Sequence, residues 1–508
     1  MRQTLKKMLK FSTKHCPKKM HIMFLSVVVL FGTALRFWNL GQWSFWIDEV
    51  FTVRDAQNLS GDSWRVIPNP IPYLAVKLSI SIAGSREWGS RLIPCLVGIV
   101  SIPMVFGFGR ALFNWRIGLL SSAFVACSSW HLFWAQNARY PVFTFFFGVL
   151  TGWLFYASLE RDSTLLTIGA LVSCLCLILS HTLAVVIVPA LAAYTLICLL
   201  ENSNRKRWLN LLIFFLPFAV PVLALILPQV RGYLFSGWGR NVWQRSPLYI
   251  VLTLVQGVSI PVAVTAFFAP IATRFNRATL FLLCYAGIPL ILFLIASQLQ
   301  NVAGYYLFWT TPAYFILAGV ACERICEKTQ QSRAQLAPTG KESRTQLAPT
   351  GKGGCERVWE ATGTASGNTL GILVPCVLLV TLLSQDYLYF KIENGGRPQW
   401  REAFEVVEAE KKPTDKVVLS EPEMGRYYLP ELTAIYIGGL LEDSEAFERE
   451  WEISGRERLW FLVDVASFNV FDAEARVRTW IRQRGRMVKT LPAFSRAKDR
   501  TIHVYLLE

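Results

Sequence analysis

Charged residues are scarce in this 508-residue sequence: 17% are Asp, Glu, Lys or Arg, whereas 53% are hydrophobic. The sequence has no P-loop and no other glycine-rich phosphate cradle, so no cytoplasmic nucleotide-binding domain is expected. None of its 11 cysteines lies after residue 376, so the C-terminal part has no disulfide framework. No cluster of Cys and His has metal-ligand spacing. This composition excludes an ordinary soluble domain.

Long apolar runs dominate the first three-quarters of the chain. A run of about 20 apolar residues spans a bilayer as a helix, and the sequence contains eleven such runs. They lie near 22–38, 92–112, 117–134, 141–159, 164–180, 183–200, 209–230, 247–270, 278–297, 303–322 and 368–388. The Pro-flanked run at 71–83 is shorter and predicts an interfacial helix. We therefore expect an all-α polytopic membrane protein with about eleven transmembrane helices.

The positive charges predict how the chain is oriented. The N-terminal leader is basic, but Arg36-Phe37-Trp38 offers no small-residue cleavage site, which favours a signal anchor. With a cytoplasmic N-terminus, every second loop carries Lys or Arg, as cytoplasmic loops do. The chain is then a multi-pass protein of the cytoplasmic (inner) membrane, with Asp48, Glu49 and the C-terminal part on the outer side. These signals and contacts with membrane lipids account for most of the net charge of +16, so no nucleic-acid partner is needed.

The chain divides into four parts. Residues 1–322 form the transmembrane module, and residues 323–367 are expected to be a disordered cytoplasmic linker. This linker contains a near-duplicated segment, at 332–341 and 343–352, with Pro and Gly in both copies. The last transmembrane helix covers 368–388, and residues 389–508 form an extracytoplasmic α/β domain.

This C-terminal part alternates strands and helices. Helical spacing begins at Trp400 and recurs near 444–453 and 472–484. Apolar runs at 416–419, 434–437, 459–463 and 503–507 predict strands. The alternation over about 110 residues is typical of a small α/β domain.

An acidic pair, Asp48-Glu49, follows the first apolar run and lies between Trp46 and Phe51. Carboxylates in a folded, partly dry loop can have the shifted acidity that proton transfer requires. An ordinary solvated loop is the alternative interpretation of this pair alone.

Several ordered motifs, taken with this pair, resemble a known family. The chain is similar to the polytopic (GT-C type) glycosyltransferases that use lipid-linked sugars, bacterial relatives of the protein O-mannosyltransferases and of the lipid A aminoarabinose transferase. The motifs are Asp48-Glu49, residues 87–94 (EWGSRLIP), 107–113 (GFGRALF), 136–140 (QNARY), 180–182 (SHT), and Tyr305-Tyr306 with Pro312. Trp400-Arg401 and Tyr427-Tyr428 match more loosely. Many relatives carry Arg before the late tyrosine, where this chain has Gly304.

The resemblance implies an enzyme that transfers a hexose or pentose from a polyprenyl phosphate to a lipid, glycan or protein acceptor at the outer face. Asp48 would be the general base, giving inversion, and Glu49 would position the acceptor or hold a divalent cation. A phosphate leaves without protonation, so one base suffices. The candidate substrate- and phosphate-binding residues are Arg139, Tyr140, Arg91, Glu87, His181 and Tyr305, with Arg139 suited by its bidentate geometry.

A divalent metal ion, with Glu87 and His181 as ligands, is the one cofactor considered. Each candidate also has a structural interpretation: Arg139 as a snorkelling side chain and His181 as a packing residue at a helix break. Two other functions remain open. A transporter or flippase for lipid-linked sugars would usually show internal repeats or charges at mid-membrane, which we do not find. An enzyme that moves whole oligosaccharides would have a similar sequence.

Overall fold

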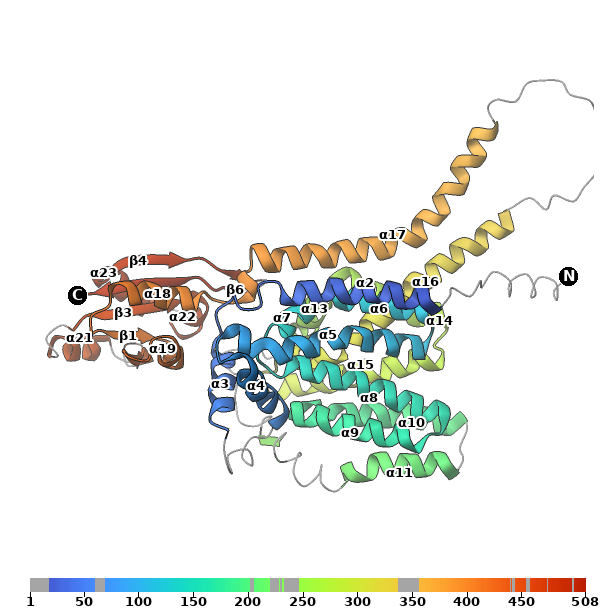
Figure 1. The fold of residues 1–508 in the computed structure, drawn as a ribbon, viewed down its shortest axis with the longest axis horizontal. Coiled ribbons are helices and arrows are strands. Elements are labelled where there is room, and N and C mark those ends of the chain that lie inside the picture. The colour runs from blue at the N-terminus through green and yellow to red at the C-terminus, as the bar shows by residue number, and fades with distance from the viewer. Residues whose placement is uncertain are drawn as a thin grey trace, which may run out of the picture.

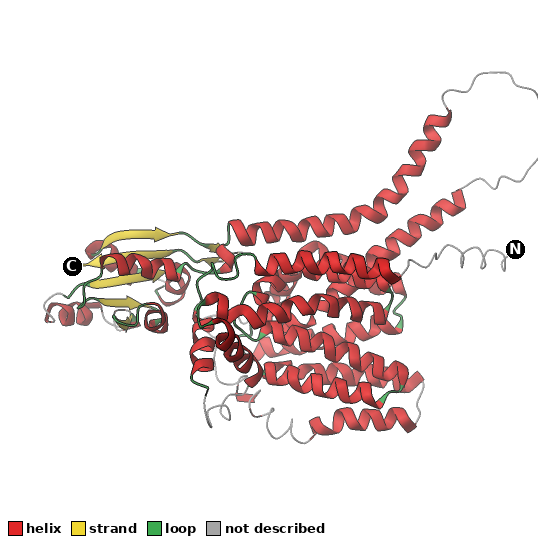
Figure 2. Ribbon diagram, viewed as in Figure 1, coloured by secondary structure: helices red, strands yellow, loops and turns green. Residues whose placement is uncertain are grey.

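A computed structural model gives the fold. It describes residues 18–59, 69–201, 205–219, 246–336, 356–438, 444–453, 457–472, 474–495 and 498–508, together with positions 228, 231, 232 and 440. Figure 1 shows a bundle of helices running side by side, with a small sheet domain at one end. Figure 2 shows that, apart from this domain, the described chain is helical.

The described part of the bundle is built from long and short helices. They are α2 (Lys18–Phe37), α5 (Glu87–Leu112), α6 (Trp115–Ala126), α7 (Ser129–Ala135), α8 (Pro141–Arg161), α9 (Thr164–Ser180), η2 (Thr182–Val186), α10 (Ile187–Glu201), α11 (Arg205–Ala219), α13 (Pro247–Val258), α14 (Ile260–Thr273), α15 (Arg277–Leu299), η4 (Gly304–Thr310), α16 (Thr311–Leu336) and α17 (Glu356–Lys391). Large side chains such as Phe108, Phe155 and Trp309 fill the core of the bundle.

The described residues contain seven helices long and apolar enough to cross a membrane, or up to nine if two bent pairs each count as one span. The bent pairs are α6–α7, at 63°, and α13–α14, at 100°. Of the two other predicted runs, 164–180 forms α9, a shorter apolar helix of 17 residues. The run at 209–230 lies only partly within the described residues.

The predicted linker overlaps the ends of two long helices. α16 continues to Leu336 and α17 begins at Glu356, so helices replace the linker at both of its ends. Residues 337–355, which hold most of the duplicated segment, lie outside the described residues. The remainder of the linker therefore stays a prediction.

Two short helices lie at the end of the bundle that carries the sheet domain (Figure 1). They are α3 (Ile47–Gln57), which contains the acidic pair, and α4 (Pro70–Ala83). The helix expected at 71–83 is thus present. The far ends of α16 and α17 and the start of α2 lie at the opposite end of the bundle.

The C-terminal domain contains a five-stranded mixed sheet in the order β2-β1-β3-β7-β4. β1 pairs in parallel with β2 and β3, whereas β7 is antiparallel to β3 and β4. The elements are η5 (Asn394–Gly396), α18 (Trp400–Glu410), β1 (Lys416–Leu419), α19 (Pro422–Tyr428), β2 (Thr433–Tyr436), α21 (Ser444–Ile453), β3 (Leu459–Asp464), α22 (Val465–Phe471), α23 (Arg476–Arg484), β4 (Arg486–Leu491), the two-stranded β5 (Phe494–Ser495) and β6 (Lys498–Asp499), and β7 (Ile502–Leu507). The four predicted strands are confirmed as β1, β2, β3 and β7, whereas β4, β5 and β6 were not predicted.

Alternation along the strands divides the sheet into two apolar faces. On one face, Val418, Phe461 and Tyr505 pack with residues of α22 and α23. On the other, Trp460 and Leu462 pack with α18 and α19. That second cluster also contains Phe45, Val50 and Val53 from α3 and the turn before it, so one core joins the sheet domain to the bundle.

A glycine makes the bend between α17 and the sheet domain possible. Gly395 has φ 61°, and a Cβ atom there would lie 2.7 Å from the ring of Trp43. A side chain at this position meets both an unfavourable backbone conformation and a buried ring.

We expect Gly395→Ala to lower the thermal unfolding temperature in detergent, with a loss of about 1–3 kcal/mol. Gly287→Ala is the matched control, since a Cβ atom there meets nothing within 4 Å and φ is not positive. Equal stability of the two variants would contradict this account of the bend.

Candidate active site

The acidic pair lies in the first turn of α3, where negative charge is favoured by the helix dipole. Successive residues of a helix are rotated by about 100°, so the two neighbouring carboxylates point in different directions. Asp48 lines a large cavity, whereas Glu49 is fully buried. The pair therefore separates into one accessible and one inaccessible carboxylate.

Glu49 is the centre of a buried ion-pair network. Its Oε1 accepts hydrogen bonds of 2.8 Å from Arg91 Nε and from the backbone amide of Ala138. Its Oε2 accepts from Arg91 at 2.8 Å and from Arg397 Nε at 3.3 Å. Burial alone would raise the pKa of the Glu49 carboxyl, but the two guanidinium charges and these hydrogen bonds lower it.

The two arginines tie together distant parts of the chain. Arg91, at the start of α5, also donates to the backbone carbonyls of Leu40, Trp43 and Ser44. Arg397 follows α17 and donates to the Gln136 carbonyl at 2.7 Å. The network thus fixes the turn before α3, the segment that carries Arg139, and the entry to the sheet domain.

This geometry corrects two predicted positions. Glu49 was expected to contact the acceptor or a cation, and Arg91 to bind phosphate. Both side chains have 0% exposure and bind each other away from the cavity. The carboxylate of Glu49 and the guanidinium of Arg91 bind each other and thereby stabilise the site.

Asp48 forms an ion pair with Arg139. The Asp48 carboxylate lies 3.1 Å from the guanidinium, and Arg139 also contacts the Thr52 hydroxyl at 3.3 Å. Burial would lower the pKa of Arg139, but the charge of Asp48 raises it, so the guanidinium stays charged. Its Nε is buried without a hydrogen-bond partner among the described residues.

Both side chains line a cavity of about 1130 Å³ at the end of the bundle. Aromatic side chains form much of its wall: Trp46, Phe51, Tyr73, Trp130, Phe133, Trp134, Tyr140, Tyr249, Tyr305, Tyr306, Tyr389 and Trp400. The sheet domain closes another side with Glu421, Asp464, Ser467, Lys498 and Arg500. The volume and the apolar lining suit a substrate with both a lipid and a polar part.

The cavity brings together five of the eight predicted site residues: Asp48, Arg139, Tyr140, His181 and Tyr305. The His181 ring stacks between Tyr140, at 4.2 Å, and Tyr306, at 4.9 Å. Gly304 precedes Tyr305 and Tyr306. A Cβ atom there would lie 2.6 Å from Thr253, so a larger residue does not fit.

Glu87, the remaining predicted residue, lies outside the cavity. Its carboxylate accepts a hydrogen bond from the Tyr428 hydroxyl at 2.9 Å and lies 3.4 Å from Arg401. It thus joins α5 to the sheet domain and has no contact with His181. The described residues contain no group of three or more His, Cys, Asp or Glu that could hold a metal ion. Glu87 and His181 therefore do not form the expected metal site.

Sequence reasoning missed three residues at this end of the molecule. Arg397 follows two glycines after the last apolar run, and an isolated arginine in such a turn is a usable signal. Glu421 and Asp464 follow or end the parallel strands β1 and β3, and ligands of α/β sheets bind beyond the carboxyl ends of parallel strands.

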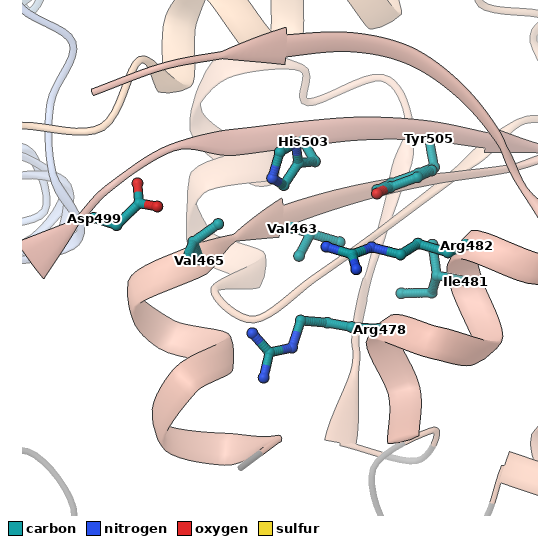
Figure 3. A pocket seen from close by; sticks show the side chains of 8 residues that line it. All are labelled: Val463, Val465, Arg478, Ile481, Arg482, Asp499, His503 and Tyr505. Atoms are coloured by element: carbon teal, nitrogen blue, oxygen red, sulfur yellow. The ribbon is translucent and has the colours of Figure 1, made fainter. Parts of the chain in front are cut away.

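A second, smaller cavity of about 170 Å³ lies within the sheet domain (Figure 3). Arg478 and Arg482 reach it from α23, and His503 and Tyr505 from β7. None of the predicted site residues lines it. The larger cavity is therefore the candidate active site.

The fold is similar to that of two enzymes of known structure. ArnT from Cupriavidus metallidurans in the apo state has a similar structure, with a TM-score of 0.54 and 15% identity over 96% of this chain and 97% of that chain. ArnT bound to undecaprenyl phosphate is similar with a TM-score of 0.55 and 13% identity over 97% of this chain and 98% of that chain. The oligosaccharyltransferase AglB from Archaeoglobus fulgidus, in complex with an inhibitory peptide and a dolichol-phosphate, also has a similar structure. Its TM-score is 0.54, with 12% identity over 96% of this chain and 74% of that chain.

A sequence profile matches part of the chain. The profile of the dolichyl-phosphate-mannose-protein mannosyltransferase family matches residues 68–231. No curated protein matches the sequence. The family profile and the structures together confirm the resemblance and the fold class inferred from the sequence.

We expect Glu49→Gln to destabilise the protein by about 3–5 kcal/mol, because it leaves two buried guanidinium groups without their carboxylate. Thermal unfolding in detergent measures this loss. Glu431→Gln is the control, since Glu431 pairs with Lys411 at the exposed surface. The role given to Glu49 is wrong if its variant unfolds at the same temperature as the control.

Proposed function

We propose that this protein transfers a sugar from a polyprenyl-phosphate donor to an acceptor at the outer face of the cytoplasmic membrane, with inversion at the anomeric carbon. The ion pair of Asp48 and Arg139 in the wall of the large cavity is the observation that carries this proposal. It places a carboxylate, the form a base requires, beside a cation suited to a phosphate.

In the proposed reaction Asp48 accepts the proton of the acceptor hydroxyl. The acceptor oxygen then forms a bond to the anomeric carbon, while the bond from that carbon to the phosphate oxygen breaks. The electron pair of the broken bond leaves with the phosphate. Arg139, which lines the cavity, stabilises the added negative charge.

Other residues support these two. Tyr140, His181 and Tyr305 line the same cavity and are proposed to contact the donor. Glu49 and Arg91 are positioning residues, because they hold the segments that carry Asp48 and Arg139. The steps above use residues of this chain alone, and the described residues contain no group of three or more His, Cys, Asp or Glu that could hold a metal ion.

The similar structures support the choice of donor. ArnT has been captured with undecaprenyl phosphate and AglB with a dolichol-phosphate. AglB has also been captured with a tethered acceptor peptide. A polyprenyl-phosphate donor and an acceptor that enters beside the sheet domain fit the cavity of the present chain.

The expected orientation of the chain is part of the proposal. The basic start of α2 and the far ends of α16 and α17 would face the cytoplasm, and the cavity with residues 389–508 would face outside. Their location at opposite ends of the bundle supports this assignment (Figure 1).

The test uses purified protein in detergent with a labelled polyprenyl-phosphate hexose and a membrane extract as acceptor. We expect transfer of the label, and a loss of about 10²–10⁴-fold in Asp48→Asn because the base is removed. Asp55→Asn is the matched control, since Asp55 lies on the same helix, pairs with Arg54 and does not line the cavity.

Unchanged transfer by Asp48→Asn would refute the assigned base. Movement of the labelled lipid across vesicle membranes without any transfer would instead favour a flippase.

A further inference from the structure

The sheet domain contributes a carboxylate to the cavity that the proposed reaction does not use. Glu421 follows β1, lines the large cavity, and is half-buried. It occupies the N-cap position of α19 but makes no capping hydrogen bond. Among the described residues, no hydrogen bond or ion pair reaches its carboxylate. Such a carboxylate can accept hydrogen bonds from a ligand in the cavity.

The neighbouring acidic residues, Asp464 and Glu423, already have hydrogen-bond or ion-pair partners. Asp464 lies level with Glu421, because Leu419 pairs with Leu462 in the parallel register of β1 and β3. However, Asp464 caps α22, accepting hydrogen bonds from the amides of Ala466 and Ser467 and from the Ser467 hydroxyl at 2.6 Å. Glu423 pairs with Arg54 and Arg426.

Packing of α19 on α3 places Glu421 near Asp48. The ring of Tyr427 in α19 lies 5.4 Å from Phe45, and Glu423 lies 3.4 Å from Arg54 of α3. The charge of Asp48 acts on Glu421, but no hydrogen bond joins the two carboxylates among the described residues. The cavity therefore has an acid on each of two walls, one from each part of the protein.

We infer that Glu421 is an acceptor-positioning residue, which binds a second hydrogen-bond donor of the acceptor while Asp48 takes the proton of the reacting hydroxyl. The chemical class that fits is an acceptor with neighbouring hydroxyl groups. This inference rests on the proposed function. It assigns the sheet domain the selection of the acceptor and the bundle the binding of the donor.

The charge of Glu421 gives the inference a measurable signature. Burial, followed by the charges of Asp48 and Asp464, raises its pKa to about 7. The other charged groups lining the cavity are Arg139, Lys498, Arg500 and Glu393. An ionised carboxylate accepts a stronger hydrogen bond than a neutral one. Acceptor binding should therefore strengthen as the pH rises through about 7.

The experiment measures transfer from a labelled polyprenyl-phosphate hexose at pH 6 and pH 8 while the amount of membrane extract is varied. In the unchanged protein, the half-saturating amount of extract should fall between pH 6 and pH 8. In Glu421→Gln the half-saturating amount should be the same at both pH values and close to that of the unchanged protein at pH 6. At pH 8 it should be on the order of tenfold higher than in the unchanged protein. Hydrolysis of the donor without extract should be unaffected. Glu423→Gln, from the same short helix, should behave as the unchanged protein.

The failures can be told apart. If the unchanged protein transfers no label, the proposed function fails and the inference fails with it. If transfer occurs and depends on Asp48, but Glu421→Gln keeps the pH dependence of the half-saturating amount, only the inference is overturned. An equal loss of transfer and donor hydrolysis at both pH values would show a structural role and also overturn it.

Discussion

The buried carboxylate of Glu49 is the constraint on which the rest of the site depends. A charge without access to water is stable only when it is paired and hydrogen-bonded, and Glu49 meets this requirement with Arg91, Arg397 and the Ala138 amide. Satisfying one carboxylate therefore requires α3, α5, the 136–139 segment and the residues after α17 to meet at a single point. Asp48 and Arg139 are next to that point, and their separation follows from it.

The sheet domain is part of the same construction. Its apolar face shares a core with α3, and Glu87 binds Tyr428 and Arg401 of this domain. The large cavity has walls from both parts. In the proposed function, this interface joins the pocket for the lipid donor to the surface of the sheet domain that binds the acceptor. We therefore assign acceptor binding to the sheet domain, although this domain carries neither Asp48 nor Arg139.

Much of this could be predicted from the sequence, and the exceptions have physical causes. Apolar length predicted the bundle, and short apolar runs predicted strands β1, β2, β3 and β7. The edge strand β4 is mostly exposed, so it lacks that signal. Asp48 and Glu49 look equivalent in sequence, because they differ only in the direction in which each side chain points from a short helix. The Arg397–Glu49 pair joins residues 348 positions apart, which no local pattern reveals. Glu421 could have been found from its place after a parallel strand.

The central claim is that the lipid phosphate of the donor is received at Arg139, opposite the carboxylate that activates the acceptor. A structure of the protein in lipid nanodiscs with bound undecaprenyl phosphate tests it most directly. The account expects the phosphate oxygens within hydrogen-bond distance of the Arg139 guanidinium, inside the aromatic cavity, with Asp48 facing the open side. A phosphate bound at the opposite end of the bundle, or in the small cavity beside Arg482, would contradict it.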